Sequence, residues 1–527
     1  MGTLPVTEPE GDAVVGKATR PTVPRPLLQA AGILFVALGV LSVNVARSLV
    51  PLEAIEYRKD CRGETYSMAS WRYWDDLAGA VNTYLRRTGP VRFLEGEEKA
   101  PPTYESLTIY WVAQEKIQPY EFWRTLPRRR WAREAIDWTP APTEDAGRAM
   151  LAAAGFRLLS GVSPYLLVWL GPLLAIPMLA WLIWSLCARA RQPGAALVTT
   201  VLLACSSYVA EILTLPHSAV GFQFLGVILL ASLAVTLLSP PAPSRRRAAC
   251  FIGLAGLWFA VFTVTRAGTG LVAPGFVALF VLYETRLGAS GKAAVLRAAA
   301  WALLFLSPYL VARPPEHHNV WTSVWEGLAD FGEDRGFSWH DRDAKRALKA
   351  AGIEPFANPK ELSEVHETFF RERVIQAIRE DPAWYATVLV RRAVRTLSFH
   401  DLAPTCASDG QASAHPTSHY KYTTTAEHFG IGPKRHEFPF WVLPLPIALW
   451  AALAASGTLR RSAFWRTQAG VGLVLVAGVL PTPVLISTFA GQETQMAVIL
   501  AFYSAGQLAS LVGGRRPARE PETGRGV

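Results

Sequence analysis

The stretch from His217 to Thr265 reads HSAVGFQFLGVILLASLAVTLL (217–238), SPPAPSRRR (239–247) and AACFIGLAGLWFAVFTVT (248–265). The two flanking parts are apolar runs of about 20 residues, the length of an α-helix that crosses a hydrocarbon layer of roughly 30 Å. The connection between them contains consecutive arginines, and such clusters gather in the cytoplasmic loops of membrane proteins. This stretch therefore predicts two membrane helices joined by a cytoplasmic loop.

Apolar runs of this kind recur along the whole chain of 527 residues, which is 51% hydrophobic. They lie at 27–46, 163–187, 194–214, 217–238, 248–265, 270–286, 294–312, 438–457, 468–489 and 493–513. We therefore expect an all-α membrane protein with about ten transmembrane helices. The net charge of +10 does not indicate a nucleic-acid partner, because many arginines lie in short clusters between the apolar runs.

The basic clusters recur at every second junction, as the positive-inside rule requires. We therefore expect a multi-pass protein of the cell (inner) membrane, with both termini in the cytoplasm and two large extracytoplasmic segments. The predicted division is a disordered cytoplasmic tail (1–26), the first transmembrane helix (27–50), an extracytoplasmic loop with interfacial helices (51–162), six transmembrane helices (163–312), a second extracytoplasmic segment with a juxtamembrane helix (313–437), three transmembrane helices (438–513) and a cytoplasmic tail (514–527).

Both large segments contain amphipathic helical patterns. Apolar residues recur at helical spacing between Trp71 and Leu85, which predicts a helix in the membrane interface. In the second segment, Asp381 can cap a helix that has Pro382 at its first position. The residues of this helix that the pattern singles out are the apolar Trp384, Tyr385, Val388, Leu389 and Leu397, and the cations Arg391, Arg392 and Arg395.

This order of elements resembles the GT-C superfamily of membrane glycosyltransferases, and within it the bacterial members that are like dolichyl-phosphate-mannose-protein mannosyltransferases. The stretches that are similar are Arg157–Pro164, Thr265-Arg266 with Pro274, Val320–Trp339, and Asp381–Tyr385 followed by the arginines. The resemblance implies a GT-C-like fold, a polyprenyl-phosphate-linked sugar as donor, and a lipid or glycan acceptor on the outer membrane face. It also implies inversion at the anomeric carbon.

The chain departs from the family at one motif. The family usually has an Asp-Glu pair shortly after the first membrane helix, followed by a Tyr, and the nearest match here is Gly63-Glu64-Thr65-Tyr66. Gly63 occupies the position of the usual Asp, and Asp60 lies just upstream. Glu64 or Asp60 is therefore the expected catalytic base.

Sugar transfer from a lipid phosphate needs a carboxylate to accept the proton of the acceptor and cations to stabilise the departing phosphate. Glu211 is a further catalytic candidate, because it interrupts an apolar run near the predicted outer end, where an unpaired carboxylate is costly. Each acid also has a structural interpretation. Glu64 could be an exposed acid neutralised by nearby arginines, and Glu211 could pair with an arginine.

The expected substrate-binding residues lie at predicted outer helix ends, and they are Arg266, Arg391, Arg392, Arg395, His217 and Glu493. The arginines would hold phosphate, although Arg266 could simply extend to the interface and the others could stabilise a helix C-terminus. His217 could hydrogen-bond to Glu211 or be a structural histidine. Glu493 begins the last apolar run, where a carboxylate also suits the helix dipole.

No cofactor or metal site is predicted. Most of the 10 histidines lie in 313–437, but no pair has the H-E-x-x-H spacing that would support a divalent cation. Cys61 and Cys406 lie in the two large segments and could form a disulfide or remain unpaired. The expected partners are membrane lipids, the polyprenyl-phosphate sugar and its acceptor.

Two other functions remain open at this point. A non-catalytic GT-C-like subunit of cell-envelope polysaccharide assembly is favoured by Gly63, which removes the usual carboxylate. A transporter is disfavoured, because transporters place ionisable groups near the bilayer midplane, whereas the ionisable residues here lie near predicted helix ends.

Overall fold

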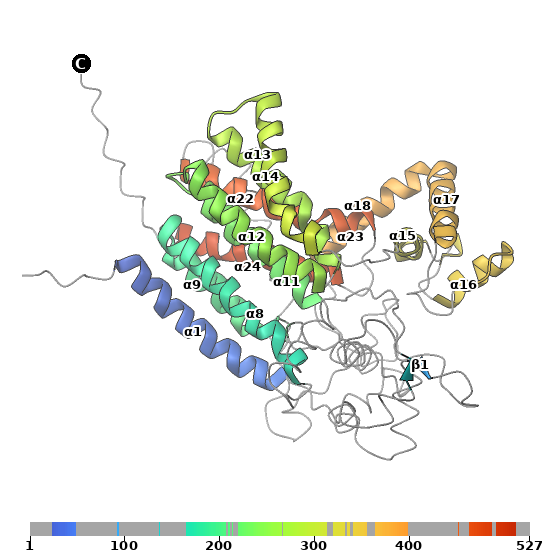
Figure 1. Cartoon of the computed structure of the whole chain (residues 1–527), viewed down its shortest axis with the longest axis horizontal. Coiled ribbons are helices and arrows are strands. Elements are labelled where there is room, and N and C mark those ends of the chain that lie inside the picture. The colour runs from blue at the N-terminus through green and yellow to red at the C-terminus, as the bar shows by residue number, and fades with distance from the viewer. Residues whose placement is uncertain are drawn as a thin grey trace, which may run out of the picture.

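The computed structural model describes two groups of helices. It covers residues 24–48, 92–93, 136–137, 165–206, 209–210, 213, 220–265, 267–312, 320–332, 335–337, 341–355, 364–398, 452, 463–486 and 492–512. Figure 1 shows a bundle of long helices with a smaller group, α15, α16 and α17, beyond one of its ends. Within the described residues, the strands are the antiparallel pair β1 (Arg92–Phe93) and β2 (Ile136–Asp137).

The bundle is built from the apolar runs. Its helices are α1 (Arg25–Ser48), α8 (Tyr165–Trp184) continued by the π-helix η2 (Ser185–Arg189), α9 (Pro193–Cys205), α11 (Val220–Leu238), α12 (Arg245–Thr265), the 3₁₀-helix η3 (Ala267–Val272), α13 (Ala273–Arg286), α14 (Gly291–Ala312), α22 (Ala463–Val479), α23 (Pro481–Leu485) and α24 (Gln492–Val512). Their buried apolar side chains form one continuous core. The core lies mainly around α11, most of whose side chains are fully buried.

Six helical stretches are long and apolar enough to cross a membrane, which supports the expectation of a membrane protein. They are Arg25–Val45, Leu170–Arg189, Arg245–Thr265, Gly268–Arg286, Gly291–Ala312 and Thr467–Leu485. Two further apolar helices are shorter, at Pro193–Cys205 and Phe222–Leu238. The predicted run 438–457 lies outside the described residues apart from residue 452, so a total of about ten spans stays a prediction.

Hydrogen bonds between helices show which ends of the bundle helices meet. At one end, Arg189 donates to the carbonyl of Pro241 (2.6 Å), and the Tyr283 hydroxyl donates to that of Pro243 (2.8 Å). The Arg286 guanidinium donates to the Thr467 hydroxyl at the same end (2.7 Å). We call this the cationic end, because it holds the arginines at the end of η2 and before α9 (Arg189 and Arg191), in the first turn of α12 (Arg245–Arg247) and at the end of α13 (Arg286).

The opposite end of the bundle is the junction end, where the smaller group attaches. There the Asn44 amide of α1 donates to the carbonyl of Ala204 near the end of α9 (2.5 Å). The helix α14 starts at the cationic end, and so its last residue, Ala312, lies at the junction end. The described helices that precede segments 51–162 and 313–437 therefore both end on the same side of the bundle.

The smaller group has a core of its own. It consists of α15 (Val320–Gly327), the 3₁₀-helix η4 (Leu328–Asp330), α16 (Asp341–Ala350) and α17 (Glu364–Glu380), and α18 (Pro382–Ser398) connects it to the bundle. Trp325 packs on Phe370 with ring centroids 5.0 Å apart, and Leu328 and Leu348 are fully buried beside them. This second core shows that part of segment 313–437 is a folded unit.

A carboxylate from α17 caps the first turn of α15. Glu367 accepts hydrogen bonds from the backbone N–H groups of Trp321 (2.8 Å) and Thr322 (3.1 Å) and from the Thr322 hydroxyl (2.7 Å). These N–H groups have no partner within an eight-residue helix, because the first turn of a helix leaves its donors free. The acid thus joins two helices through residues that are 45 positions apart in the sequence, Thr322 and Glu367.

Replacing Glu367 with alanine is expected to destabilise the smaller group by about 1–3 kcal/mol, because it leaves partly buried donors without an acceptor. The measurement is thermal unfolding of the purified chain, followed by tryptophan fluorescence. Glu372→Ala, which removes an exposed acid from the same helix, is the control and should change stability by less than about 0.5 kcal/mol. Equal effects of the two substitutions would contradict the capping role.

Candidate functional site

The candidate site is the contact between α18 and the junction end of the bundle. The helix α18 begins where sequence analysis places it, because Asp381 accepts a hydrogen bond from the backbone N–H of Trp384 (2.9 Å) and Pro382 occupies the first position. The helix then packs against α17 on one side and against α23 and α24 on the other. It is therefore the element that connects the smaller group to the bundle.

The start of α18 is held by aromatic and ionic contacts. Arg335 forms an ion pair with Asp381 (2.7 Å) and lies over the Trp384 ring at 4.5 Å, while Phe337 stacks on that ring at 5.8 Å. The hydrogen bond from the Trp384 N–H, and then the Arg335 guanidinium, lower the pKa of the Asp381 carboxyl. Both contacts favour the charged form of the carboxyl.

This cap gives a pH prediction. Because the folded-state pKa of Asp381 lies below its ordinary value of 3.8, the cap stabilises the fold at pH values above 3.8. That contribution is lost as the pH falls through the folded-state pKa. The difference in melting temperature between the wild type and Asp381→Ala should thus be constant near neutral pH and shrink as the pH falls below 3.8 and through the folded-state pKa. A difference that grows on acidification would contradict this assignment.

The three predicted arginines of α18 do not share one environment. Arg392 is fully buried and donates to the carbonyl of Gly327 at the end of α15 (2.5 Å) and to that of Val484 in α23 (3.2 Å). Arg391 is exposed, and its guanidinium lies 5.7 Å from the centroid of the Phe331 ring. Arg395 lies one turn farther along the same helix. Because Arg391 is exposed and Arg392 is buried, Arg391 is the one of these two that can reach a phosphate.

Most other predicted site residues lie outside the described residues, and these are Asp60, Glu64, Glu211, His217 and Arg266. Cys61, Cys406 and the predicted helix from Trp71 to Leu85 also lie outside them. Glu493 is in the first turn of α24, which packs against α18, so its backbone lies at the junction end. Of the predicted site residues, Arg391, Arg392 and Arg395 thus lie on α18, and Glu493 lies on the helix α24 that packs against it.

The hollow that the described part of the chain contains lies outside this contact. A hollow of about 780 Å³ runs along α17, and its lining residues are Arg371, Glu372, Ile375, Gln376, Arg379 and Glu380. None of these is a predicted site residue. Among the described residues there is no group of His, Cys, Asp and Glu that could hold a metal ion.

Sequence analysis did not single out Glu284, which is the most buried carboxylate of the described bundle. It is 0% exposed and accepts hydrogen bonds from Arg245 (3.0 Å) and from the Trp301 indole (2.9 Å) at the cationic end. An acid within the apolar run 270–286 was a signal that could have found it, because such residues are retained in a membrane helix only when paired or functional.

Comparisons with known proteins give no relative. No family model, no curated protein and no solved structure matches this chain.

Proposed function

We propose that the chain is a GT-C-like membrane glycosyltransferase that moves a sugar from a polyprenyl-phosphate carrier to a lipid or glycan acceptor at the outer face of the cell (inner) membrane. In this proposal the chain crosses the membrane about ten times, both termini are cytoplasmic, and the junction end faces outward. The observation that carries the proposal is the exposed Arg391 at the junction end. The helices that precede both large segments also end there.

The proposed chemistry is one displacement at the anomeric carbon. Glu64 or Asp60, assisted by Glu211, removes the proton from the acceptor hydroxyl, which then attacks the sugar. The bond between the sugar and the carrier phosphate breaks, and the phosphate leaves with its negative charge. Arg391, with Arg266 and Arg395, stabilises that charge, while His217 and Glu493 contact the substrate. No metal or other cofactor is needed for these steps.

The position of Arg391 suits a lipid-linked donor. Val390 and Val394, which neighbour it on α18, are each 62% exposed and present apolar surface beside the charge. A guanidinium next to exposed valines can hold a phosphate at the membrane surface while an isoprenoid chain stays in the lipid. Arg392 contributes by fixing the helix that carries Arg391.

The test uses the full chain in lipid vesicles with radiolabelled mannose or arabinose on a polyprenyl phosphate and a membrane extract as acceptor. We expect transfer by the wild type, and a loss of at least about 100-fold for Glu64→Gln combined with Asp60→Asn. Arg391→Gln should lower transfer by roughly tenfold or more. The control Arg371→Gln removes an exposed arginine of α17 and should leave transfer unchanged.

The second candidate function is a non-catalytic subunit of cell-envelope polysaccharide assembly, and Gly63 in place of the usual acid favours it. The two functions differ in cells that lack the chain and then receive variants. If variants at Glu64, Asp60 and Glu211 all restore the envelope glycan as well as the wild type does, while the empty vector does not, the subunit function is correct and the transferase proposal fails.

A further inference from the structure

We propose that the seam between α12 and α14 at the cationic end binds an anionic phospholipid, with its phosphate on the cations and its acyl chains along the two helices. This site is at the opposite end of the bundle from the proposed sugar-transfer site. It depends on the charge and exposure of described residues and not on the transferase activity.

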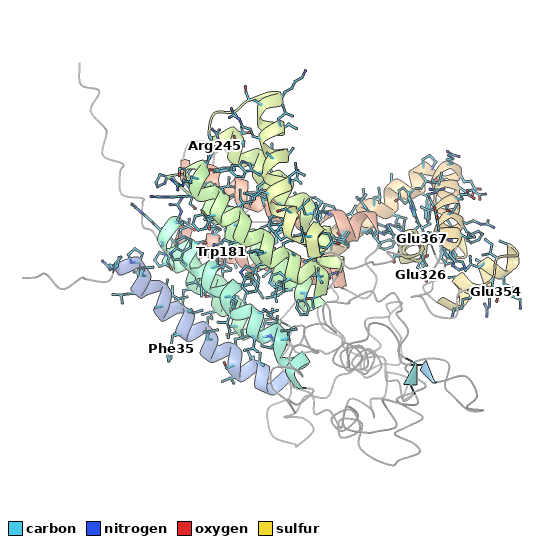
Figure 2. All side chains as sticks on the ribbon, viewed as in Figure 1. Phe35, Trp181, Arg245, Glu326, Glu354 and Glu367 are labelled. Atoms are coloured by element: carbon cyan, nitrogen blue, oxygen red, sulfur yellow. The ribbon has the colours of Figure 1, made fainter. Side chains whose placement is uncertain are left out.

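A buried carboxylate fixes two of the cations. Glu284 of α13 is 0% exposed and lies 3.0 Å from Arg245 of α12 and 3.5 Å from Arg297 of α14. The side chains of both arginines are 50% exposed, so each can bind Glu284 on one side and a ligand on the other. Figure 2 shows Arg245 at one end of α12. One carboxylate therefore holds two guanidinium groups at the membrane edge and neutralises one of them.

The surrounding charge is positive. Arg246 and Arg247 follow Arg245 in the first turn of α12, Lys292 lies in the first turn of α14, and all three are exposed. Glu284 is the one acid among the described residues from Cys187 to Ala312. The cations at the seam thus outnumber the carboxylate that they share, which favours a ligand with net negative charge.

The surface next to these cations is apolar. Along α12, Leu254 and Leu257 are 47% and 56% exposed, and along α14, Val295, Leu296 and Leu303 are 59%, 71% and 66% exposed. The two helices are packed closely, since a Cβ built on Gly256 would lie 3.1 Å from the carbonyl carbon of Phe305. Cations beside this apolar wall of exposed side chains match a phosphate head group beside its own acyl chains.

The charge balance selects the class of lipid. A phosphatidylcholine head group carries its own cation, which the excess of arginine and lysine would repel. A phosphatidylglycerol head group has net negative charge and would be attracted by each cation near the surface. Free inorganic phosphate would bind the cations without using the apolar wall, so its affinity should be much weaker.

The test is native mass spectrometry of the purified full chain in detergent, with added phosphatidylglycerol, phosphatidylcholine or inorganic phosphate. We expect retained phosphatidylglycerol adducts and few of the other two. Arg246→Gln, Arg247→Gln and Lys292→Gln, combined in one chain, should weaken phosphatidylglycerol binding by at least roughly tenfold. This variant leaves the ion pairs of Glu284 intact, and size-exclusion chromatography would confirm that it is folded.

The matched control combines Arg371→Gln, Arg373→Gln and Arg379→Gln, which remove the same charge from exposed positions of α17 in the smaller group. Its phosphatidylglycerol binding should equal that of the wild type. The proposal is overturned if the two triple variants lose binding equally, if phosphatidylcholine is retained as well as phosphatidylglycerol, or if inorganic phosphate binds as tightly as the lipid.

Discussion

Replacing Arg392 with glutamine is expected to lower the free energy of unfolding of the smaller group by about 3 kcal/mol or more. The guanidinium is fully buried and donates to the carbonyl groups of Gly327 and Val484, which belong to α15 and α23. Hydrogen bonds from a charged donor contribute more than neutral ones, and their loss leaves buried acceptors without partners. We therefore expect α15 and α18 to separate from the bundle.

Thermal unfolding and limited proteolysis of the purified chain measure this effect. Arg392→Gln should give a lower melting temperature and faster cleavage within 313–398. Arg392→Lys should restore little of the lost melting temperature, because a single ammonium group cannot donate to two carbonyl groups with the geometry of a guanidinium. Arg391→Gln is the control for stability, since Arg391 is the neighbouring exposed arginine. If Arg391→Gln is as destabilising as Arg392→Gln, the structural role of Arg392 is wrong.

Replacing Gly275 with alanine should destabilise the bundle by about 1–3 kcal/mol, because overpacking displaces backbone atoms. A Cβ built on Gly275 of α13 would lie 2.8 Å from the Gly478 Cα atom and 2.9 Å from the Val474 carbonyl oxygen, both in α22. Helix backbones approach this closely only where both carry small residues, a common device in membrane bundles.

Gly253→Ala is the matched control for this prediction, because a Cβ on Gly253 of α12 meets nothing within 4 Å. Alanine favours a helix over glycine by up to about 1 kcal/mol, so this variant should be neutral or more stable than the wild type. Gly275→Ala is thus expected to lower the melting temperature, whereas Gly253→Ala should leave it unchanged or raise it. If Gly275→Ala does not lower the melting temperature relative to Gly253→Ala, the close packing of α13 on α22 is wrong.

Local signals in the sequence predicted several of the described helices. The start of α18 followed from Asp381 and Pro382, because a cap is decided by neighbouring residues. The apolar run 270–286 was predicted as one helix, whereas the chain forms η3 over Ala267–Val272 before α13. Pro274 lies in the first turn of α13, where proline is favoured because the N–H group that it lacks would have no partner within the helix.

The role of individual arginines was less predictable. The sequence interpretation assigned Arg391, Arg392 and Arg395 one role. Arg392 is four residues after the apolar Val388, however, and so lies on the same face of the helix as Val388. Val388 and Thr396 are both buried, as that spacing implies. What the sequence does not contain is the position of the carbonyl groups of Gly327 and Val484, which come from distant parts of the chain. The pairing of Glu284 with Arg245 and Arg297 was unpredictable for the same reason, because the three residues belong to three different helices.

We expect segments 51–162 and 313–437 to share one side of the membrane, opposite the cationic end. The direct measurement labels single cysteines from outside with a membrane-impermeant maleimide, in a chain whose own cysteines are replaced by serine. The positions are Glu97→Cys, Glu364→Cys and Arg246→Cys. We expect the first two to react in intact cells and the third to react only after the membrane is opened. Reaction of Glu97→Cys and Glu364→Cys from opposite sides would contradict it.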